Sequence, residues 1–341
     1  MSLQGDIKYR AYIHEADDLK AALQSGLRFI RWDKYVNRRS RVFVKPNFTF
    51  PTYKPGVTTS PEFLRVLLTL LKSRAGQVIV GESDGGNHAF TADEAFQGHN
   101  MPEICQQTGA ELVNLSGLPA KTVESDILGK KVAVRLPRLL LEEIDCFISV
   151  PVLKIHVMTT VSLSLKNLWG CVPDTMRCLH HQNLNYKLAL IAQLLQPKIV
   201  VIDGTYALNK HGPMYGEAVK TNLLMVADNP VAADALGARL LGFSPQQVKT
   251  IILAEEAGLG SARLSDVVVT EGWQRFKKQF QIEKTVIDRI SSLFFHSDLL
   301  AKLIMDSPLT SVAYKVAGKL RTPAEKELAS QMGKNKLGPY C

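Results

Sequence analysis

The chain has 341 residues, of which 46% are hydrophobic and 21% are charged, and its formal net charge at pH 7 is +9. This composition is typical of a globular protein with a sizeable core and excludes a disordered or low-complexity chain. The positive balance favours acidic partners or anionic ligands, although charge alone does not choose between them.

Neither a transmembrane segment nor a secretory signal is expected. A membrane span needs about 18 uninterrupted apolar residues. The long apolar stretch over residues 132–153 is interrupted by Arg135, Arg138, Glu142, Glu143 and Asp145. The polar first ten residues contain no apolar signal core, so we expect a cytoplasmic protein with reduced cysteines.

Short, β-branched apolar runs alternate with helical patterns over most of the chain, which predicts an α/β fold with a mainly parallel sheet and helices on both faces. The expected strands cover residues 7–13, 41–44, 77–81, 111–115, 131–136, 146–150, 198–202 and 223–227. Ser60 is expected to cap a helix that begins at Pro61, and Asp228 to cap a helix over residues 229–241. Residues 245–258 predict a third helix that ends at a glycine.

The alternation of strands and helices stops near residue 272. We therefore divide the chain into an α/β domain, residues 1–272, and a basic helical C-terminal extension, residues 273–341. Residues 274–341 contain 12 Lys and Arg and 6 Asp and Glu, and so carry +6 of the total charge of +9.

The extension also has an apolar helical stripe, followed after Pro308 by a second, weaker helix. The stripe consists of Ile282, Val286, Ile290, Leu293, Phe294, Leu300 and Ile304. We expect it to pack on the α/β domain or on a second copy of the chain, with an acidic membrane surface as the alternative.

Candidate site residues follow the expected strands, because ligands of open parallel sheets bind beyond the carboxyl ends of the strands. In chain order, four strand ends deliver Lys45 with Asn47, Glu82 with Gly85 and Gly86, Lys154 with His156, and Asp203. Any single one of these could be an ordinary turn. Their convergence at one edge predicts a shared site.

Lys166 and Asn167 lie in the apolar segment 162–170, where an unpaired ammonium is costly to bury. We expect Lys154, His156 and Lys166 to hold a small anion such as a carboxylate or phosphate. A second interpretation pairs the lysines with a structural Asp203 or Glu82. A lysine desolvated beside another cation could also act as a general base or Schiff-base nucleophile.

The candidate catalytic residues are therefore Lys154, His156, Lys166 and Asp203. The candidate ligand-binding residues are Lys45, Asn47, Glu82, Gly85, Gly86, Asn167, His180, Gly212, Gly216 and Asp234. Gly212 and Gly216 belong to a loop that allows close backbone approach to a ligand. Asp234 lies among small apolar residues and needs a partner, which we expect to be a lysine or the backbone amides of this loop.

Other motifs add little. Cys171, Cys178, His180 and His181 are of metal-ligating type, but six residues separate the cysteines, whereas zinc sites pair ligands about two to four apart. We expect no metal site here and cysteines that pack as small apolar residues. The phosphate-loop and dinucleotide patterns are absent from the sequence.

Taken in order, several segments resemble the family called domain of unknown function 362, whose members often carry ferredoxin-type iron–sulfur domains. The matching segments are residues 45–47, 58–62, 81–86, 151–156, 165–170, 180, 203–204, 212–216, 228–235 and 256–260. The resemblance covers about residues 41–272 and implies a shared fold and site rather than a known reaction. Ser60 and Val152 depart from the pattern, and no Cys-x-x-Cys-x-x-Cys run is present, so we expect no iron–sulfur cluster.

Two functions stay open. The first is an enzyme or enzyme-like domain that acts on a small anionic metabolite at the candidate catalytic residues. The second is a non-catalytic binding or accessory protein in iron–sulfur or redox metabolism, which rests on the resemblance alone. Specific nucleic-acid binding is not expected, because no aromatic and basic recognition motif accompanies the charge. The cofactor stays unassigned, and a homo-oligomer or a partner could form through the C-terminal helices.

Overall fold

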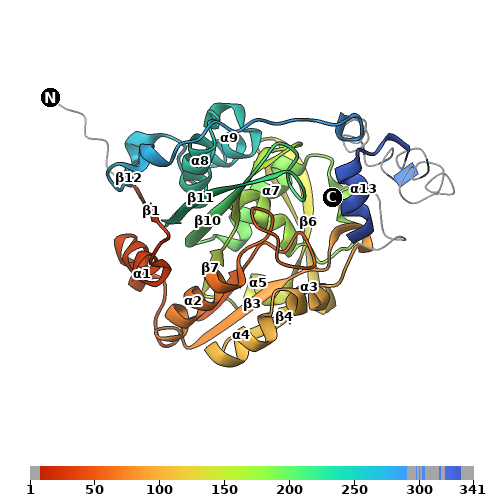
Figure 1. Cartoon of the computed structure of the whole chain (residues 1–341). Helices are drawn as coiled ribbons and strands as arrows, with labels where there is room; N and C mark the ends of the chain where they lie inside the picture. Colours follow the sequence, from red (N-terminus) through yellow and green to blue (C-terminus); the bar gives the residue numbers. More distant parts are fainter. Residues whose placement is uncertain are drawn as a thin grey trace.

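The computed structural model describes residues 8–289, 297, 299, 302–303, 315 and 319–331. They form a ten-stranded, mostly parallel sheet with helices on both faces, which confirms the predicted fold class (Figure 1). In spatial order the sheet consists of β12 (Val267–Val269), β1 (Tyr9–Glu15), β11 (Glu217–Ala227), β10 (Ile199–Asn209), β7 (Cys146–Ser149), β2 (Arg41–Lys45), β3 (Gln77–Glu82) and β4 (Glu111–Asn114), with β8 (Val152–His156) beside β10 and β9 (Thr160–Ser162) beside β8. β11 runs antiparallel to both of its neighbours, β1 and β10.

Two apolar cores lie on the two faces of the sheet, because successive residues of a buried strand point in opposite directions. Phe43 joins one core, while its neighbours Val42 and Val44 join the other. The first core is covered by α7 (Leu184–Leu195), α8 (Pro230–Leu240), α9 (Lys249–Glu256) and a hairpin of β5 (Ala120–Ile127) and β6 (Lys130–Pro137). The second is covered by α1 (Leu19–Phe29), α2 (Pro61–Lys72), α3 (Ala92–Gly98) and α4 (Met101–Thr108).

The expected strands all exist, but one lies elsewhere than predicted. Residues 131–136 form part of β6, which pairs only with β5 among the described strands, outside the main sheet. Four further strands, β5, β8, β9 and β12, are not predicted by the sequence pattern. β8 was overlooked because its sequence, VLKIH, follows a proline and contains a lysine and a histidine, although all five residues are buried.

The structure confirms the predicted N-cap of α2 but not the predicted N-cap of α8. Ser60 Oγ accepts the Phe63 N–H at 3.4 Å and Pro61 occupies the first turn, as expected. The predicted cap at Asp228 is wrong, because Asn229 Oδ1 accepts the first amides of α8. Asp228 follows β11 directly, and its carboxylate accepts the Arg10 N–H of neighbouring β1 at 2.7 Å. The third expected helix is split into a short 3-10 turn and α9.

The described part of the extension contacts the α/β domain. Trp273 and Phe280 are buried in the first core, and the Phe280 N–H donates to the Leu241 carbonyl oxygen at 3.0 Å. The helix α13 (Pro323–Gln331) follows later in the chain. Ile282 and Val286 of the expected stripe are described, and the division at residue 272 stays a prediction. The following stripe positions lie outside the described residues: Ile290, Leu293, Phe294, Leu300 and Ile304.

Among the described residues, no helix has the length and apolar character that crossing a bilayer requires.

Candidate functional site

A buried ion pair joins the carboxyl ends of β2 and β3. Lys45 and Glu82 end these neighbouring parallel strands, and Lys45 Nζ donates to Glu82 Oε2 at 2.5 Å. The second carboxylate oxygen accepts the Ser83 N–H at 3.1 Å. A Cβ added at Gly170 would lie 2.6 Å from Glu82 Oε1 and 2.8 Å from Lys45 Nζ. A side chain at position 170 would therefore displace the ends of both side chains, because the segment after α6 (Ser164–Asn167) lies directly against this pair.

Lys154 lies on β8 with no exposed surface, and neutral oxygens surround its ammonium. Burial, followed by the charge of Lys166, lowers the pKa of Lys154 well below its ordinary value. The partners of Nζ are Asn47 Oδ1 at 2.9 Å, Thr49 Oγ1 at 3.1 Å, the Val57 carbonyl at 2.7 Å and the Pro213 carbonyl at 3.3 Å. Three of these four oxygens carry no proton of their own, which matches the three N–H groups of a charged ammonium. The geometry thus favours a charged lysine without a contacting carboxylate.

Two asparagines connect Lys154 to the Lys45–Glu82 pair. Asn47 Nδ2 donates to Asn167 Oδ1 at 3.3 Å. Asn167 Nδ2 in turn donates to the Lys45 carbonyl at 3.1 Å and to Ser149 Oγ at 3.2 Å. Five of the predicted residues, Lys45, Asn47, Glu82, Lys154 and Asn167, therefore form one buried hydrogen-bonded network, which we call the lysine–asparagine network.

His156 lies two residues after Lys154 on β8, so both side chains leave the same face of the strand. Its Nδ1 accepts the Met158 N–H at 3.0 Å, which assigns the imidazole proton to Nε2 as a donor. Burial, followed by the charges of Lys166 and Lys154, lowers the pKa of His156 well below its ordinary value. The imidazole is therefore neutral at pH 7.

Lys166 is a half-buried residue of α6, and its charge acts on several neighbours. It contributes to the lowered pKa values of Lys154, His156 and His181, in each case after the effect of burial. The ring of His181 lies 5.7 Å from that of Trp169, in the segment that follows Lys166. The Lys166 charge therefore acts on Lys154 and His156 of β8 and on His181.

The two aspartates of the predicted site bind backbone amides instead of lysines. Asp203 accepts the Ser60 N–H at 2.9 Å and the Thr205 N–H at 3.0 Å, and burial raises its pKa. Asp234 accepts the amides of Ser164 and Leu165, so its expected partner in the loop 212–216 was wrong. Only Glu82, of the two carboxylates considered as lysine partners, pairs with a lysine, and that lysine is Lys45.

The acidic glycine turn after β3 is held by the segment 172–181. Arg177 is buried and donates to Ser83 Oγ at 3.0 Å and to the Asp84 carbonyl at 2.7 Å. Gly85 and Gly86 follow in this turn, where a Cβ at Gly85 would lie 2.7 Å from the Phe90 ring. These contacts fix the shape of the turn.

The remaining predicted residues lie at the surface or in the loop near Lys154. The side chain of His180 is 45% exposed, and its Nε2 lies 2.9 Å from Asp174 Oδ2. A Cβ at Gly212 would lie 2.0 Å from the Ile155 carbonyl oxygen, and Gly216 adopts a φ of 146°. Both glycines therefore meet a backbone requirement of the loop that supplies the Pro213 carbonyl to Lys154.

The described cysteines are buried and dispersed. Cys105, Cys146, Cys171 and Cys178 are buried and in the reduced state, and burial raises the pKa of Cys146 and of Cys171 to about 12. No cluster of three or more His, Cys, Asp or Glu side chains within the described ranges is arranged to hold a metal ion. Cys341 lies outside those ranges.

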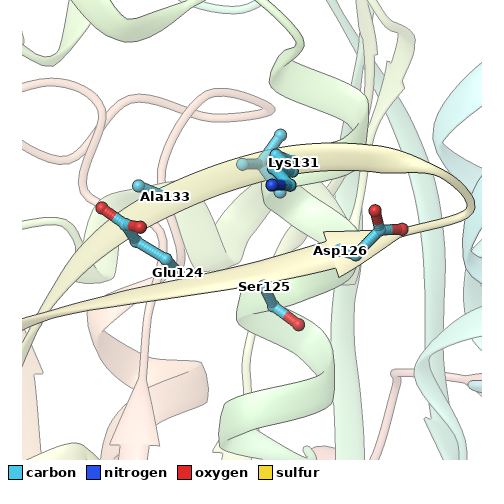
Figure 2. Close-up of a pocket in the computed structure, with 6 residues that line it drawn as sticks. Glu124, Ser125, Asp126, Lys131 and Ala133 are labelled. Atoms are coloured by element: carbon cyan, nitrogen blue, oxygen red, sulfur yellow. The ribbon is translucent and has the colours of Figure 1, made fainter.

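Two hollows in the described part of the chain lie elsewhere. The first has a volume of about 450 Å³, and its described lining residues, among them Glu124, Asp126 and Lys131, belong to the hairpin β5–β6 (Figure 2). The second, of about 760 Å³, lies between the beginning of α1 and α2 and includes Thr205. Neither hollow contains a residue of the lysine–asparagine network. The network is the better candidate for the functional site, because its polar side chains are buried and joined by hydrogen bonds.

Sequence reasoning missed several contributors to the site. Thr49 and the carbonyl oxygens of Val57 and Pro213 complete the surroundings of Lys154, and Arg177 shapes the glycine turn. The lysine in an apolar strand was a signal for such acceptors, but carbonyl oxygens carry no residue-type signature. Gly170 could have been singled out as the glycine that ends the apolar segment 162–170.

Fold and site together define a mostly parallel α/β protein with a buried lysine–asparagine network at the carboxyl ends of its strands. The sequence profile described as "Domain of unknown function (DUF362)" matches residues 42–239. The chain belongs to this family, which confirms the resemblance seen in the sequence.

A curated relative extends the comparison. The thylakoid-associated protein sll1697 of Synechocystis sp. (strain ATCC 27184 / PCC 6803 / Kazusa) is 26% identical over 261 residues, which cover 73% of this chain and 78% of the relative. No solved structure matches the chain. Because that relative is associated with thylakoids, a cytoplasmic location of this chain stays a prediction.

Proposed function

We propose that this protein is an enzyme or enzyme-like domain that binds a small anionic metabolite between β8 and α6. The observation that carries the proposal is the buried ammonium of Lys154, whose hydrogen-bond partners are four neutral oxygens. A buried charge with no carboxylate in contact favours an anion nearby. The nearest predicted acidic groups are engaged elsewhere, Glu82 by Lys45 and Asp203 by backbone amides.

Lys166 and His156 are proposed to contact the ligand. Lys166 is half-buried, and so is more accessible than Lys154, which has no exposed surface. His156 keeps its Nε2 proton and can donate to a carboxylate or phosphate oxygen without carrying a charge. Such a pair could bind an anion and polarise it. Lys154 would strengthen the local potential, and Asn47 and Asn167 would hold it in place.

Titration calorimetry tests this proposal with inorganic phosphate and with oxalate as probe anions. We expect at least one of them to bind the full chain saturably, and Lys166→Ala to weaken that binding at least tenfold. Lys121→Ala, on the exposed hairpin, is the matched control and should bind as the wild type does. Absence of saturable binding to the wild type, or equal binding by Lys166→Ala, would overturn the proposal.

We propose association with an acidic membrane surface as a second function, located in the C-terminal extension. Residues 274–341 carry +6. Four exposed apolar side chains, Val286, Leu299, Leu303 and Leu320, are 44–78% exposed. Basic segments with exposed leucines are attracted to anionic lipids. The association of the Synechocystis relative with thylakoids supports the same idea.

Sedimentation of the full chain with vesicles tests the second proposal. We expect binding to phosphatidylcholine vesicles that contain about a quarter phosphatidylglycerol, and little binding without the anionic lipid. Leu299→Ser with Leu303→Ser should reduce it, whereas Leu128→Ser with Leu264→Ser, exposed leucines outside the extension, should not. Binding that is equal in both double variants, or no binding at all, would refute a membrane role for the extension.

A further inference from the structure

The short helix α6 receives its N-terminal cap from another helix. Asp234, in the middle of α8, is 2% exposed. Its Oδ1 accepts the Ser164 N–H at 2.7 Å, and its Oδ2 accepts the Leu165 N–H at 3.0 Å. These are the first amides of α6, which find no acceptor within their own helix. Leu163 occupies the cap position and provides no side-chain hydrogen bond.

Close packing accompanies these hydrogen bonds. Gly237 lies three residues after Asp234, and so on the same face of α8. A Cβ at Gly237 would lie 2.7 Å from Cδ1 of Leu163, the residue directly before α6. The backbone of α8 can therefore approach the start of α6 closely enough for the short Asp234 side chain to reach two amides.

The turn that Asp234 holds carries two residues of the proposed site. Lys166 directly follows Leu165, and Asn167 connects the turn to the lysine–asparagine network through the Lys45 carbonyl. α6 has only four residues, too few to be stable by its own hydrogen bonds. Its orientation is therefore set by Asp234 at one end and Asn167 at the other.

We propose that Asp234 is the positioning residue of the anion site: by binding the first two amides of α6 it fixes where Lys166 meets the ligand. This inference rests on the proposed anion-binding function and assigns Asp234 a role through Lys166 rather than contact with the ligand. In Asp234→Asn the side-chain NH₂ would face one of the two backbone N–H donors, so one hydrogen bond is lost and α6 is held at one amide only.

Two measurements on the full chain test the inference. At pH 8, where the Asp234 carboxyl with its pKa of about 7 is ionised, we use whichever of phosphate and oxalate binds the wild type. We expect Asp234→Asn to weaken affinity about tenfold, the effect of losing one hydrogen bond to a charged group. Hydrogen exchange should accelerate at the amides of residues 163–168 and stay unchanged in the strands. Asp228→Asn is the matched control, because this carboxylate lies beside the start of α8 and binds the Arg10 amide instead. It should leave probe binding unchanged.

A double variant guards against a general loss of structure. Ser164→Pro removes one of the two donors, proline is tolerated at the first helical position, and Leu163 already has an extended backbone with φ −123° and ψ −147°. Combined with Asp234→Asn it removes the clash of donors, so the double variant should bind the probe at least as well as Asp234→Asn alone. A double variant that binds the probe more weakly than Asp234→Asn alone would overturn the inference.

The remaining outcomes are distinct. Unchanged affinity in Asp234→Asn, or faster exchange throughout the chain, would overturn the positioning role while leaving anion binding intact. Failure of the wild type to bind either probe would overturn the proposed function itself, and the inference with it.

Discussion

The buried carboxylate of Asp234 predicts an unusual dependence of stability on pH. Burial raises the pKa of Asp234 from its ordinary value of 3.8 to about 7. Between these values the folded chain keeps a proton that the unfolded chain releases, so the unfolded state binds fewer protons. The free energy of unfolding contributed by this group therefore falls as pH rises, by up to about 1.4 kcal/mol per pH unit. Below pH 3.8 and above about pH 7 the contribution is constant.

Asp234→Asn removes this titration without changing the size of the side chain. The difference in unfolding free energy between the wild type and Asp234→Asn should therefore decrease by about 2 kcal/mol from pH 5 to pH 7, because the slope of about 1.4 kcal/mol per unit flattens as the folded carboxyl becomes half-ionised near pH 7. Urea unfolding at intervals over pH 5–8 measures it, with the exposed Asp33→Asn variant as control. A difference that is constant over this range would show that burial does not perturb the Asp234 carboxyl.

Three further results are expected. Glu82→Gln leaves the Lys45 ammonium buried without its carboxylate and should lower the free energy of unfolding by about 3–5 kcal/mol. The double variant with Lys45→Met should recover most of this loss. Equal stability of Glu82→Gln and the wild type would contradict a buried ion pair. Gly212→Ala places a Cβ 2.0 Å from a backbone oxygen and should cost about 1–3 kcal/mol in urea unfolding, while Gly117→Ala, which faces open space, should be neutral; equal effects would contradict the close approach. In Cys341→Ser, the four buried thiols should react with Ellman's reagent at pH 8 only after denaturation, and rapid stoichiometric labelling of the native chain would contradict their burial.

The lysine–asparagine network shows what strand order makes predictable. Lys45 and Glu82 end two parallel strands, and parallel strands end at one edge, so their proximity follows from the sequence pattern. The place of Lys154 follows from the same rule, although the residue lies on β8 and not in the expected loop after a strand. Lys154 still lies at the predicted edge of the sheet, because β8 pairs with β10 directly after β7 ends.

The hydrogen-bond partners of Asp203 and Asp234 could not be predicted from the order of the strands. Asp234 binds amides 69 and 70 residues away in the sequence, and its choice depends on how closely α8 approaches α6. Any backbone amide is an equally good donor, so residue type does not distinguish Ser164 from the loop 212–216. Asp203 likewise binds backbone donors at Ser60 and Thr205, a preference that only the packed geometry reveals.

β10 changes its parallel neighbour from β7 to β8 along its length. The number of residues between β7 and β8 therefore decides which side chains of β8 face the site. β10 pairs with β7 through Ile199 and Val200, and then with β8 through Asp203 and Leu208. Side chains alternate along β8, so inserting one residue after Pro151 would turn Lys154 and His156 to the opposite face. Leucine and isoleucine side chains would then replace a lysine and an imidazole at the site. Chain length at this junction is therefore as much a determinant of the site as the identity of its residues, and an insertion there would abolish the site while every one of its residues was still present.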